Sequence, residues 1–266
     1  MNYNCKIIEY ENSYHIEFYD VSIKRTEDSK HEILTDDNSI DHIYTDKNND
    51  RSVKQIEHCL NVSKNRSKRN LYRIARSNTW DWFITLTFDQ KKTDSSDYDL
   101  VVSKLKNYLQ NKRKRGCPDL KYLIVPEFHK DGKHYHFHGL LSGVNDFEFK
   151  DSGHKDFLGE TIYNITNWSK NLGHTTATRI KDNARVTSYI GKYITKDMMN
   201  KLKYKRRYYA SENCYVSPEE FYNIPYEDLM SGIAEHIDYI STITINGVNR
   251  IKYIEVSKDC EFLIDR

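Results

Sequence analysis

The sequence predicts an α+β domain in which helices pack on an antiparallel sheet. The prediction depends on the order of the element patterns: a strand at 82–88, a helix at 97–114, a hairpin at 121–143 and a helix at 183–200. It also depends on residue types, because the segment WFITLTF at 82–88 is rich in the β-branched and aromatic residues that strands favour. This order is typical of helices that cover one face of an antiparallel sheet.

The first part of the chain predicts strands, a linker and a helix. Residues 3–23 alternate polar and apolar side chains and predict strands, with a hairpin around 11–13. Residues 24–50 are rich in Asp, Asn, Ser and Lys and predict a loop or linker. Residues 51–76 predict a basic amphipathic helix.

The remaining expected elements are short. They are a helix at 160–170, a strand at 174–180, a basic, tyrosine-rich loop at 201–210, and two or three strands within 236–264. The chain therefore divides into three predicted segments. These are an acidic extension with strands and linker at 1–50, a central domain at 51–210, and a β-rich extension at 211–266 that completes or flanks the sheet.

Charge is segregated along the chain, although the net charge is only +2. Residues 1–50 contain 12 acidic and 5 basic side chains, whereas residues 51–76 contain 8 basic side chains and one acid. Such a basic run suits either a solvated helix face or contact with nucleic acid.

Cysteine usage and hydropathy exclude several classes of protein. The five cysteines are scattered and never form a CxxC pair, which argues against a disulfide framework and against a structural zinc site. No apolar run has the length of a membrane span, and the N-terminus is polar rather than signal-like. We therefore expect a cytoplasmic protein with no membrane partner.

The hairpin pattern brings together three candidate metal ligands. His136 and His138 are separated by one residue, so both imidazoles lie on one face of a strand. If Asp131-Gly132 forms the loop, Glu127 faces His136 on that same face. Two imidazole nitrogens and a carboxylate oxygen, with open positions left, suit Mg²⁺ or Mn²⁺. A catalytic metal site is the resulting hypothesis, although a histidine pair of this kind also occurs on strands that bind nothing.

The segment YIGKYITK at 189–196 is the second candidate for chemistry. On a helix, Tyr189 and Tyr193 share a face, and Lys192 flanks it. A nearby cation lowers the pKa of a phenol, so this arrangement could provide a nucleophile. The alternative is an amphipathic helix that uses the same tyrosines to pack on the sheet.

These segments together resemble a known family. FITLTF at 83–88, HFHGLL at 136–141 and YIGKYITK at 189–196 are similar, in that order, to the three motifs of rolling-circle replication initiators, the HUH (His–hydrophobe–His) endonucleases. The stretch VPEFHKDGKHYHFHGLL resembles the phage and plasmid branch throughout, and the likeness covers roughly residues 70–210. The resemblance implies an HUH/RRM-like fold with a central antiparallel five-stranded sheet and helices packed on it.

The resemblance also implies a reaction. Glu127, His136 and His138 would hold the metal, and Tyr189 would attack a phosphate of single-stranded DNA at an origin. The product would be a 5′-phosphotyrosyl link with a free 3′-OH that primes synthesis, and the ends would be rejoined after replication of a plasmid or phage. Storing the bond in a covalent intermediate is what allows this rejoining.

Two residues beside the nucleophile have open roles. Lys192 would neutralise charge on the phosphate or help to activate the phenol. Tyr193 is either a second nucleophile, as in relatives that alternate two tyrosines, or a packing residue; we favour Tyr189 alone as essential. Thr85 and Thr87, on the strand expected beside the hairpin, are expected to serve packing.

The expected partners follow from charge and from what the chain lacks. The residues expected to contact the DNA backbone are Arg66, Lys68, Arg69, Lys112, Arg113, Lys114, Arg115, Lys196, Arg206 and Arg207. No GxxxxGK[ST] segment is present, so a separate helicase and a polymerase of the host would be needed. Residues 211–266 could also form a homodimer surface. The alternatives are a relaxase or single-strand transposase with the same chemistry, or a module that binds nucleic acid on an RRM-like sheet without cutting it.

Overall fold

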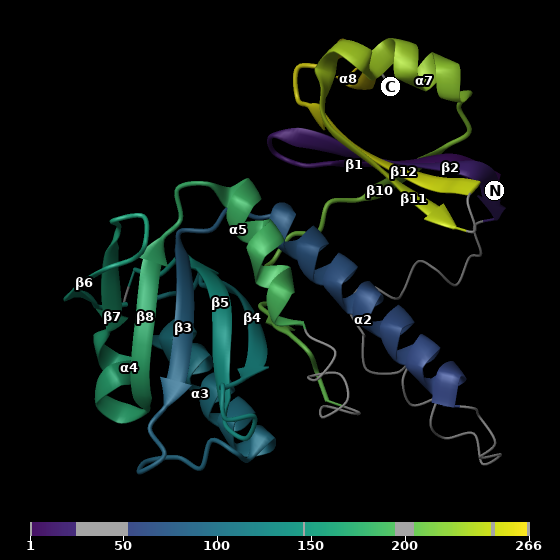
Figure 1. Ribbon diagram of the computed structural model, residues 1–266. Coiled ribbons are helices and arrows are strands. Elements are labelled where there is room, and N and C mark those ends of the chain that lie inside the picture. The colour runs from purple at the N-terminus through teal and green to yellow at the C-terminus, as the bar shows by residue number, and fades with distance from the viewer. Residues whose placement is uncertain (1, 25–52, 146, 195–204, 246–247, 265–266) are drawn as a thin grey trace. The chain divides into compact units, whose positions relative to one another are not determined.

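The computed structural model describes residues 2–24, 53–145, 147–194, 205–245 and 248–264, which form two compact units (Figure 1). The terminal unit comprises 1–34 and 216–266, and the central unit comprises 35–215. Both units pack helices on antiparallel strands, so the predicted α+β class is confirmed. The linker expected at 24–50 falls almost entirely outside the described residues.

The terminal unit joins the two ends of the chain in one five-stranded sheet, in the order β10-β1-β2-β12-β11. Its strands are β1 (Asn2–Glu9), β2 (Ser13–Lys24), β10 (Glu219–Tyr222), β11 (Ile237–Ile245) and β12 (Val248–Ser257). Its helices are α7 (Tyr226–Ile233), the 3₁₀ turn η3 (Ala234–His236) and α8 (Glu261–Ile264). The expected hairpin forms, with the Tyr10 amide donating to the Ser13 carbonyl. The turn at 246–247 lies outside the described residues.

The strands of the C-terminal extension therefore pair with the N-terminal strands and do not extend the sheet of the central unit. The reason is apolar matching across neighbouring strands. Ile16 of β2 pairs directly with Ile254 of β12, and both pack in one core with Leu229 of α7 and Leu263 of α8. These side chains bury one face of the sheet beneath the two helices.

The central unit contains a seven-stranded sheet, in the order β6-β7-β8-β3-β5-β4-β9. The strands are β3 (Trp82–Phe88), β4 (Lys121–Phe128), β5 (Tyr135–Ser142), β6 (Phe149–Lys155), β7 (Thr161–Ile165), β8 (Gly173–Arg179) and β9 (Tyr209–Ala210). The expected count of five was wrong, because the β6–β7 hairpin extends one edge and the short β9 pairs with β4 at the other. The helix expected at 160–170 begins only at Thr166, because the β-branched and aromatic run TIYNI before it forms β7.

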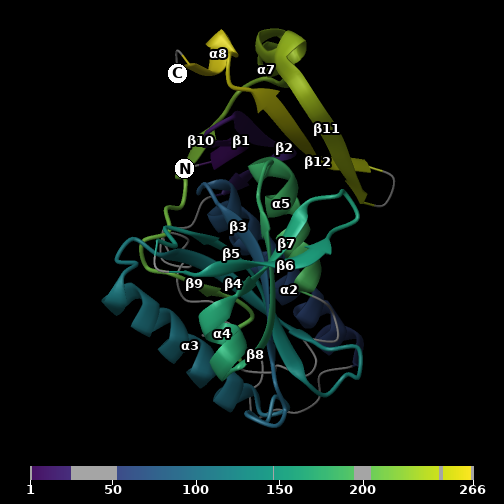
Figure 2. The ribbon, with the colours of Figure 1, turned by 90° about the vertical axis from the view of Figure 1, so that its left-hand side faces the viewer.

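Helices cover both faces of this sheet rather than the one expected (Figure 2). Helices α3 (Tyr98–Arg115) and α4 (Thr166–Asn171) pack on the face that carries Phe88, whose ring lies 5.1 Å from that of Trp168. Helices α2 (Val53–Arg76) and α5 (Asn183–Ile190) lie on the other side. Among the described residues, no helix is long and apolar enough to cross a membrane.

Candidate functional site

The hairpin of β4 and β5 sets the register that the site requires. Glu127 pairs with His136 across the two strands, as the sequence predicted. The loop is wider than two residues: pairing is closed by the His129 amide, which donates to the His134 carbonyl at 2.7 Å. The register survives because the four loop residues 130–133 are centred on the same Asp131-Gly132 pair, with Gly132 at φ +67°.

Three ligand atoms converge on this face of the sheet. Oε2 of Glu127 lies 2.9 Å from Nε2 of His136 and 2.8 Å from Nε2 of His138, and the two Nε2 atoms are 3.2 Å apart. An octahedral ion bound at about 2.1 Å holds neighbouring ligand atoms about 3 Å apart. The donor set therefore fits a divalent ion coordinated on one side, with its remaining positions open to other ligands.

The electrostatics of the cluster keep its ligands in the forms that bind metal. Burial alone would raise the pKa of the Glu127 carboxyl, but hydrogen bonds with His136 and His138 outweigh burial and lower the pKa to about 2. Burial likewise lowers the pKa of His138 from its ordinary value, with Glu127 opposing the shift. At neutral pH the cluster thus offers an ionised carboxylate and a neutral buried imidazole.

The central strand β3 orients His138 from the side opposite to Glu127. Thr85 pairs with His138 across β3 and β5, and its Oγ1 lies 3.1 Å from Nδ1 of that imidazole. When Nε2 is a metal ligand, Nδ1 carries the proton and donates to this hydroxyl. Thr85 was expected only to pack, because the sequence pattern cannot show which residue faces which across strands distant in the chain.

A glycine directly after the second histidine allows β4 to approach closely. Gly139 pairs with Ile124, and a Cβ atom at Gly139 would lie 2.8 Å from Cγ1 of Ile124 and 3.2 Å from the carbonyl of Leu123. Any larger residue would push apart the two strands that align Glu127 with the imidazoles.

The tyrosine segment folds onto the same face of the sheet. Helix α5 begins at its cap Asp182, whose carboxylate accepts from the Arg185 amide, and ends at Ile190. The chain then tightens into the 3₁₀ turn η2 (Gly191–Tyr193), so the helix expected over 183–200 is shorter, and 195–200 lie outside the described residues. Ile190 is fully buried and anchors the segment.

The two tyrosines occupy different environments. The Tyr193 ring stacks on the His138 imidazole, with centroids 3.7 Å apart and planes 14° from parallel. Burial, followed by a hydrogen bond with Tyr189, raises the pKa of Tyr193 well above its ordinary value. Tyr189 is 42% exposed and meets Tyr193 edge-on at 5.5 Å. The Lys192 ammonium lies 4.5 Å from the centre of the Tyr189 ring.

The expected DNA-contacting cations do not form one surface. Arg207 is only 6% exposed, and its guanidinium donates to the Ser63 hydroxyl at 2.7 Å and the Ser67 hydroxyl at 2.8 Å in α2, so its observed role is internal. Lys112 is equally buried, with its ammonium 4.9 Å from the centre of the Phe147 ring. Sequence periodicity cannot distinguish such buried cations from surface ones.

The other members of that set are at least partly accessible. Arg69, Lys114, Arg115 and Arg206 are exposed, while Arg66, Lys68 and Arg113 are half-buried. The basic end of α3 belongs to the helix on the opposite side of the sheet from the imidazoles. Lys196 lies outside the described residues. In the described structure, α2 and the segment after η2 therefore carry the expected cations nearest in the fold to the site face.

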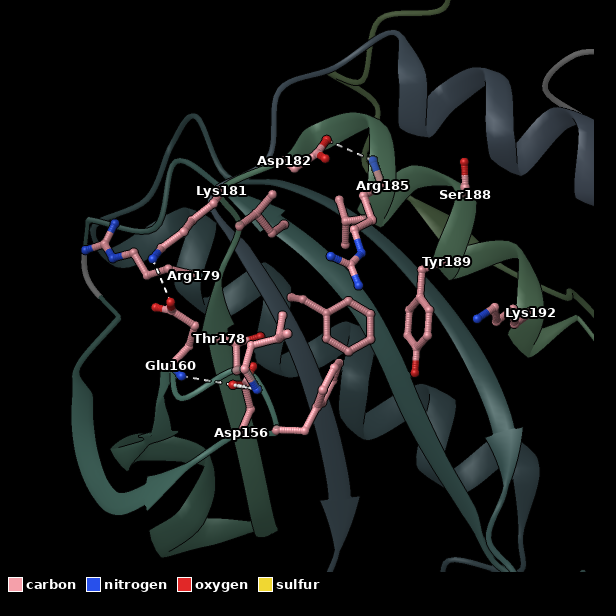
Figure 3. A pocket seen from close by; sticks show the side chains of 15 residues that line it. Asp156, Glu160, Thr178, Arg179, Lys181, Asp182, Arg185, Ser188, Tyr189 and Lys192 are labelled. Atoms are coloured by element: carbon pink, nitrogen blue, oxygen red, sulfur yellow. Dashed lines mark hydrogen bonds and ion pairs between the residues drawn. The ribbon is translucent and has the colours of Figure 1, made fainter. Parts of the chain in front are cut away.

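A cavity of about 600 Å³ opens beside Tyr189 (Figure 3). Residues of β3, the β6–β7 loop, the end of β8 and α5 line it, with Lys192 of η2. Arg185 precedes Tyr189 by one helical turn, and in Figure 3 both side chains point from α5 toward the strands. The sequence reasoning missed Arg185; its i, i+4 spacing from Tyr189 was the available signal.

The comparisons with known proteins agree with one part of the sequence interpretation. Residues 81–198 match the sequence model of a family described as replication-associated protein, of the ORF2 type. The matched segment is less than half of the chain and contains the two imidazoles, Glu127 and both tyrosines. No curated protein and no solved structure matched the chain. The family similarity supports DNA replication as the process and a Rep-type replication initiator as the class of protein.

Proposed function

We propose that the central unit is a metal-dependent HUH-type endonuclease that nicks and rejoins one DNA strand at a replication origin. The observation that carries the proposal is the contact between the two candidate motifs. The Tyr193 ring lies flat on the imidazole of His138, so the tyrosine segment and the metal-ligand cluster form one site. An ordinary amphipathic helix packed on a sheet would not require a carboxylate and two imidazoles beneath its tyrosines.

Glu127, His136 and His138 would hold the ion, which we propose to be Mn²⁺ or Mg²⁺. A divalent ion bound there withdraws charge from a phosphate and makes the phosphorus a better target for attack. Thr85 keeps the His138 ring in the orientation and tautomer that present Nε2 to the ion. Tyr193 covers the face of that ring and limits access of water to it.

Tyr189 is the better candidate for the nucleophile. Its phenol is exposed at the cavity, whereas Tyr193 is packed on His138 and has a raised pKa that makes its phenolate harder to form. In the reaction, the Tyr189 oxygen forms a bond to phosphorus as the bond from phosphorus to the 3′-oxygen breaks. The phenolic proton leaves to solvent or a nearby base, and the departing 3′-oxygen takes up a proton to give the free 3′-OH. The reverse reaction rejoins a strand.

Lys192 would place a cation beside both the phenol and the phosphate. Its ammonium already lies over the Tyr189 ring, at 4.5 Å from the centroid. From there it stabilises negative charge on the phenolate before attack and on the phosphoryl oxygens during attack. The proposed partners are single-stranded origin DNA and the host's helicase and polymerase.

A covalent-capture experiment tests the proposal. The protein is incubated with Mn²⁺ and a library of single-stranded oligonucleotides, and adducts that survive a denaturing gel are recovered and sequenced. We expect wild-type protein and the matched Tyr193→Phe variant to form adducts on a common sequence, and Tyr189→Phe to form none. His136→Ala and His138→Ala should abolish adducts while retaining most of the DNA affinity.

The outcomes separate the competing functions. Adducts from Tyr189→Phe would move the nucleophile to Tyr193. Cleavage by the histidine variants at the wild-type rate would contradict the metal site. Tight binding with no adduct from wild-type protein would indicate a nucleic-acid-binding module instead of an enzyme.

A further inference from the structure

The cavity beside Tyr189 has one wall that no motif predicts. This wall is the tip of the β6–β7 hairpin, residues 156–160, which faces the start of α5 across the cavity. Asp156 holds the tip in a fixed shape: its carboxylate accepts from the amides of Leu158 at 2.8 Å and Glu160 at 2.9 Å. Gly159 at φ +82° completes the turn.

The fixed tip presents an aromatic ring to solvent. Phe157 is 89% exposed and Leu158 is 58% exposed, and both line the cavity together with Phe83 of β3. Exposing these two side chains next to each other leaves apolar surface in water that folding would otherwise bury. A ring held by an ordered turn at a cavity mouth is suited to stacking against a flat ligand.

The charges around the cavity are largely committed elsewhere, with one exception. The Lys181 ammonium pairs with Glu160 at 2.7 Å, and the Arg179 guanidinium lies 4.4 Å from the centre of the Trp82 ring. Figure 3 shows the Arg185 guanidinium directed toward the cavity and Tyr189 instead. Across the described part of the chain, no carboxylate forms an ion pair with Arg185.

The acidic side chains at the rim do not offset this charge directly. The carboxylates of Asp156 and Asp182 accept from backbone amides, and Glu160 is paired with Lys181. The charge available to a ligand in the cavity is therefore the Arg185 guanidinium, joined by the ammonium of Lys192 near Tyr189. A cationic centre beside a nucleophile and opposite an exposed aromatic ring suits a phosphate that carries a base.

We propose that this cavity binds one nucleotide of single-stranded DNA adjacent to the scissile phosphate. Arg185 binds the phosphate of that nucleotide, and Phe157 stacks against its base. The volume of about 600 Å³ lies within the range of pockets for small ligands, which accommodates a single nucleotide. This inference deepens the proposed function and depends on it for the position of the scissile phosphate. It makes the hairpin tip a selector of the base next to the nick.

Binding of labelled oligothymidine, followed by fluorescence anisotropy with the metal chelated, tests the pocket without requiring cleavage. Phe157→Ala should weaken binding about tenfold, since a stacked base is lost. The matched control Tyr215→Ala removes another exposed aromatic ring of the central unit and should change binding less than about twofold. Arg185→Ala should reduce the slope of log affinity against log salt by about 0.7, and Arg185→Lys should restore it. Arg179→Ala should leave the slope unchanged.

A second readout uses the captured adduct. Oligonucleotides with an abasic residue at each position around the nick should show one flanking position at which wild-type protein loses adduct yield. Phe157→Ala should lose that positional effect. If both variants bind and form adducts as the wild type does, with the same positional profile, the pocket is refuted and the nicking function stands. If no protein forms adducts but binding still depends on Arg185 and Phe157, the nicking function is refuted and the nucleotide pocket stands.

Discussion

The hydroxyl of Thr85 provides a sharp test of whether the hairpin cluster binds metal. Replacing Thr85 by Val removes one hydroxyl and keeps the shape of the side chain, and valine favours strands as threonine does. The change deletes the 3.1 Å contact with Nδ1 of His138 and touches none of the three ligand atoms. A loss of metal affinity would therefore report on the orientation and tautomer of the imidazole alone.

The size of the effect follows from the burial of that imidazole. With a metal on Nε2, the Nδ1 proton of a side chain only 8% exposed would have no acceptor, which costs about 1–3 kcal/mol. In metal-free protein, the variant also leaves the Nδ1 lone pair without its donor, so part of this cost is present before binding. We therefore expect the Kd for Mn²⁺ to rise by about tenfold, at the lower end of the range for outer partners of metal ligands.

Isothermal titration calorimetry with Mn²⁺ measures this change, and thermal unfolding of the metal-free proteins checks that both are folded. The matched control is Thr87→Val, the same substitution two residues along the same face of β3, opposite His136. In the described structure, the Thr87 hydroxyl makes no hydrogen bond to an imidazole, so its loss should leave the Kd within about twofold. Equal Mn²⁺ affinities for wild type and Thr85→Val would refute the reasoning, and equal losses in both variants would show a general effect of β3.

Three further predictions concern stability and charge. The carboxylate of Glu127 has a folded-state pKa of about 2, below its ordinary 4.5, so it stabilises metal-free protein above pH 4.5 and this contribution is lost as the pH falls toward 2. The difference in unfolding free energy between wild type and Glu127→Gln, measured with urea and chelator, should shrink over that window; a constant difference would contradict the assignment. Gly139→Ala should destabilise by about 1–3 kcal/mol because of its close strand contact, whereas Gly191→Ala, with open space around it, should be neutral or stabilising by thermal denaturation. Arg207→Ala should cost about 2–4 kcal/mol of stability through its lost buried hydrogen bonds, while Arg69→Ala, which is exposed, should lower DNA affinity and leave urea unfolding unchanged; the reverse pattern would restore Arg207 as a DNA contact.

The parts of the site that were predictable depend on short-range geometry. The register of the β4–β5 hairpin follows from the position of Asp131-Gly132 and from the two-residue period of a strand, so the pairing of Glu127 with His136 could be counted from the sequence. The same period places His138 on that face. Local periodicity and turn chemistry are therefore enough to bring these three ligands together.

The parts that were not predictable depend on contacts between distant segments. The hydroxyl of Thr85 reaches His138 only because β3 lies next to β5 in the sheet, and strand order is not encoded in local periodicity. The burial of Arg207 requires α2 to pack against the segment before β9, 140 residues away from Ser67 in sequence. The same limit explains the terminal unit, where the first and last strands of the chain pair with each other.

The end of α5 explains why the two tyrosines, equivalent in the sequence pattern, differ in the structure. If the α-helix continued, Tyr189 and Tyr193 would lie one above the other on a single face and would meet a phosphate from similar positions. The chain instead tightens into the 3₁₀ turn after Ile190, a tighter winding that moves Tyr193 relative to the α-helical face. Its ring then packs on His138, while Tyr189 stays exposed in the α-helix beside Arg185. This change of helix type separates a tyrosine that orders the ligand imidazole from one that remains available for attack.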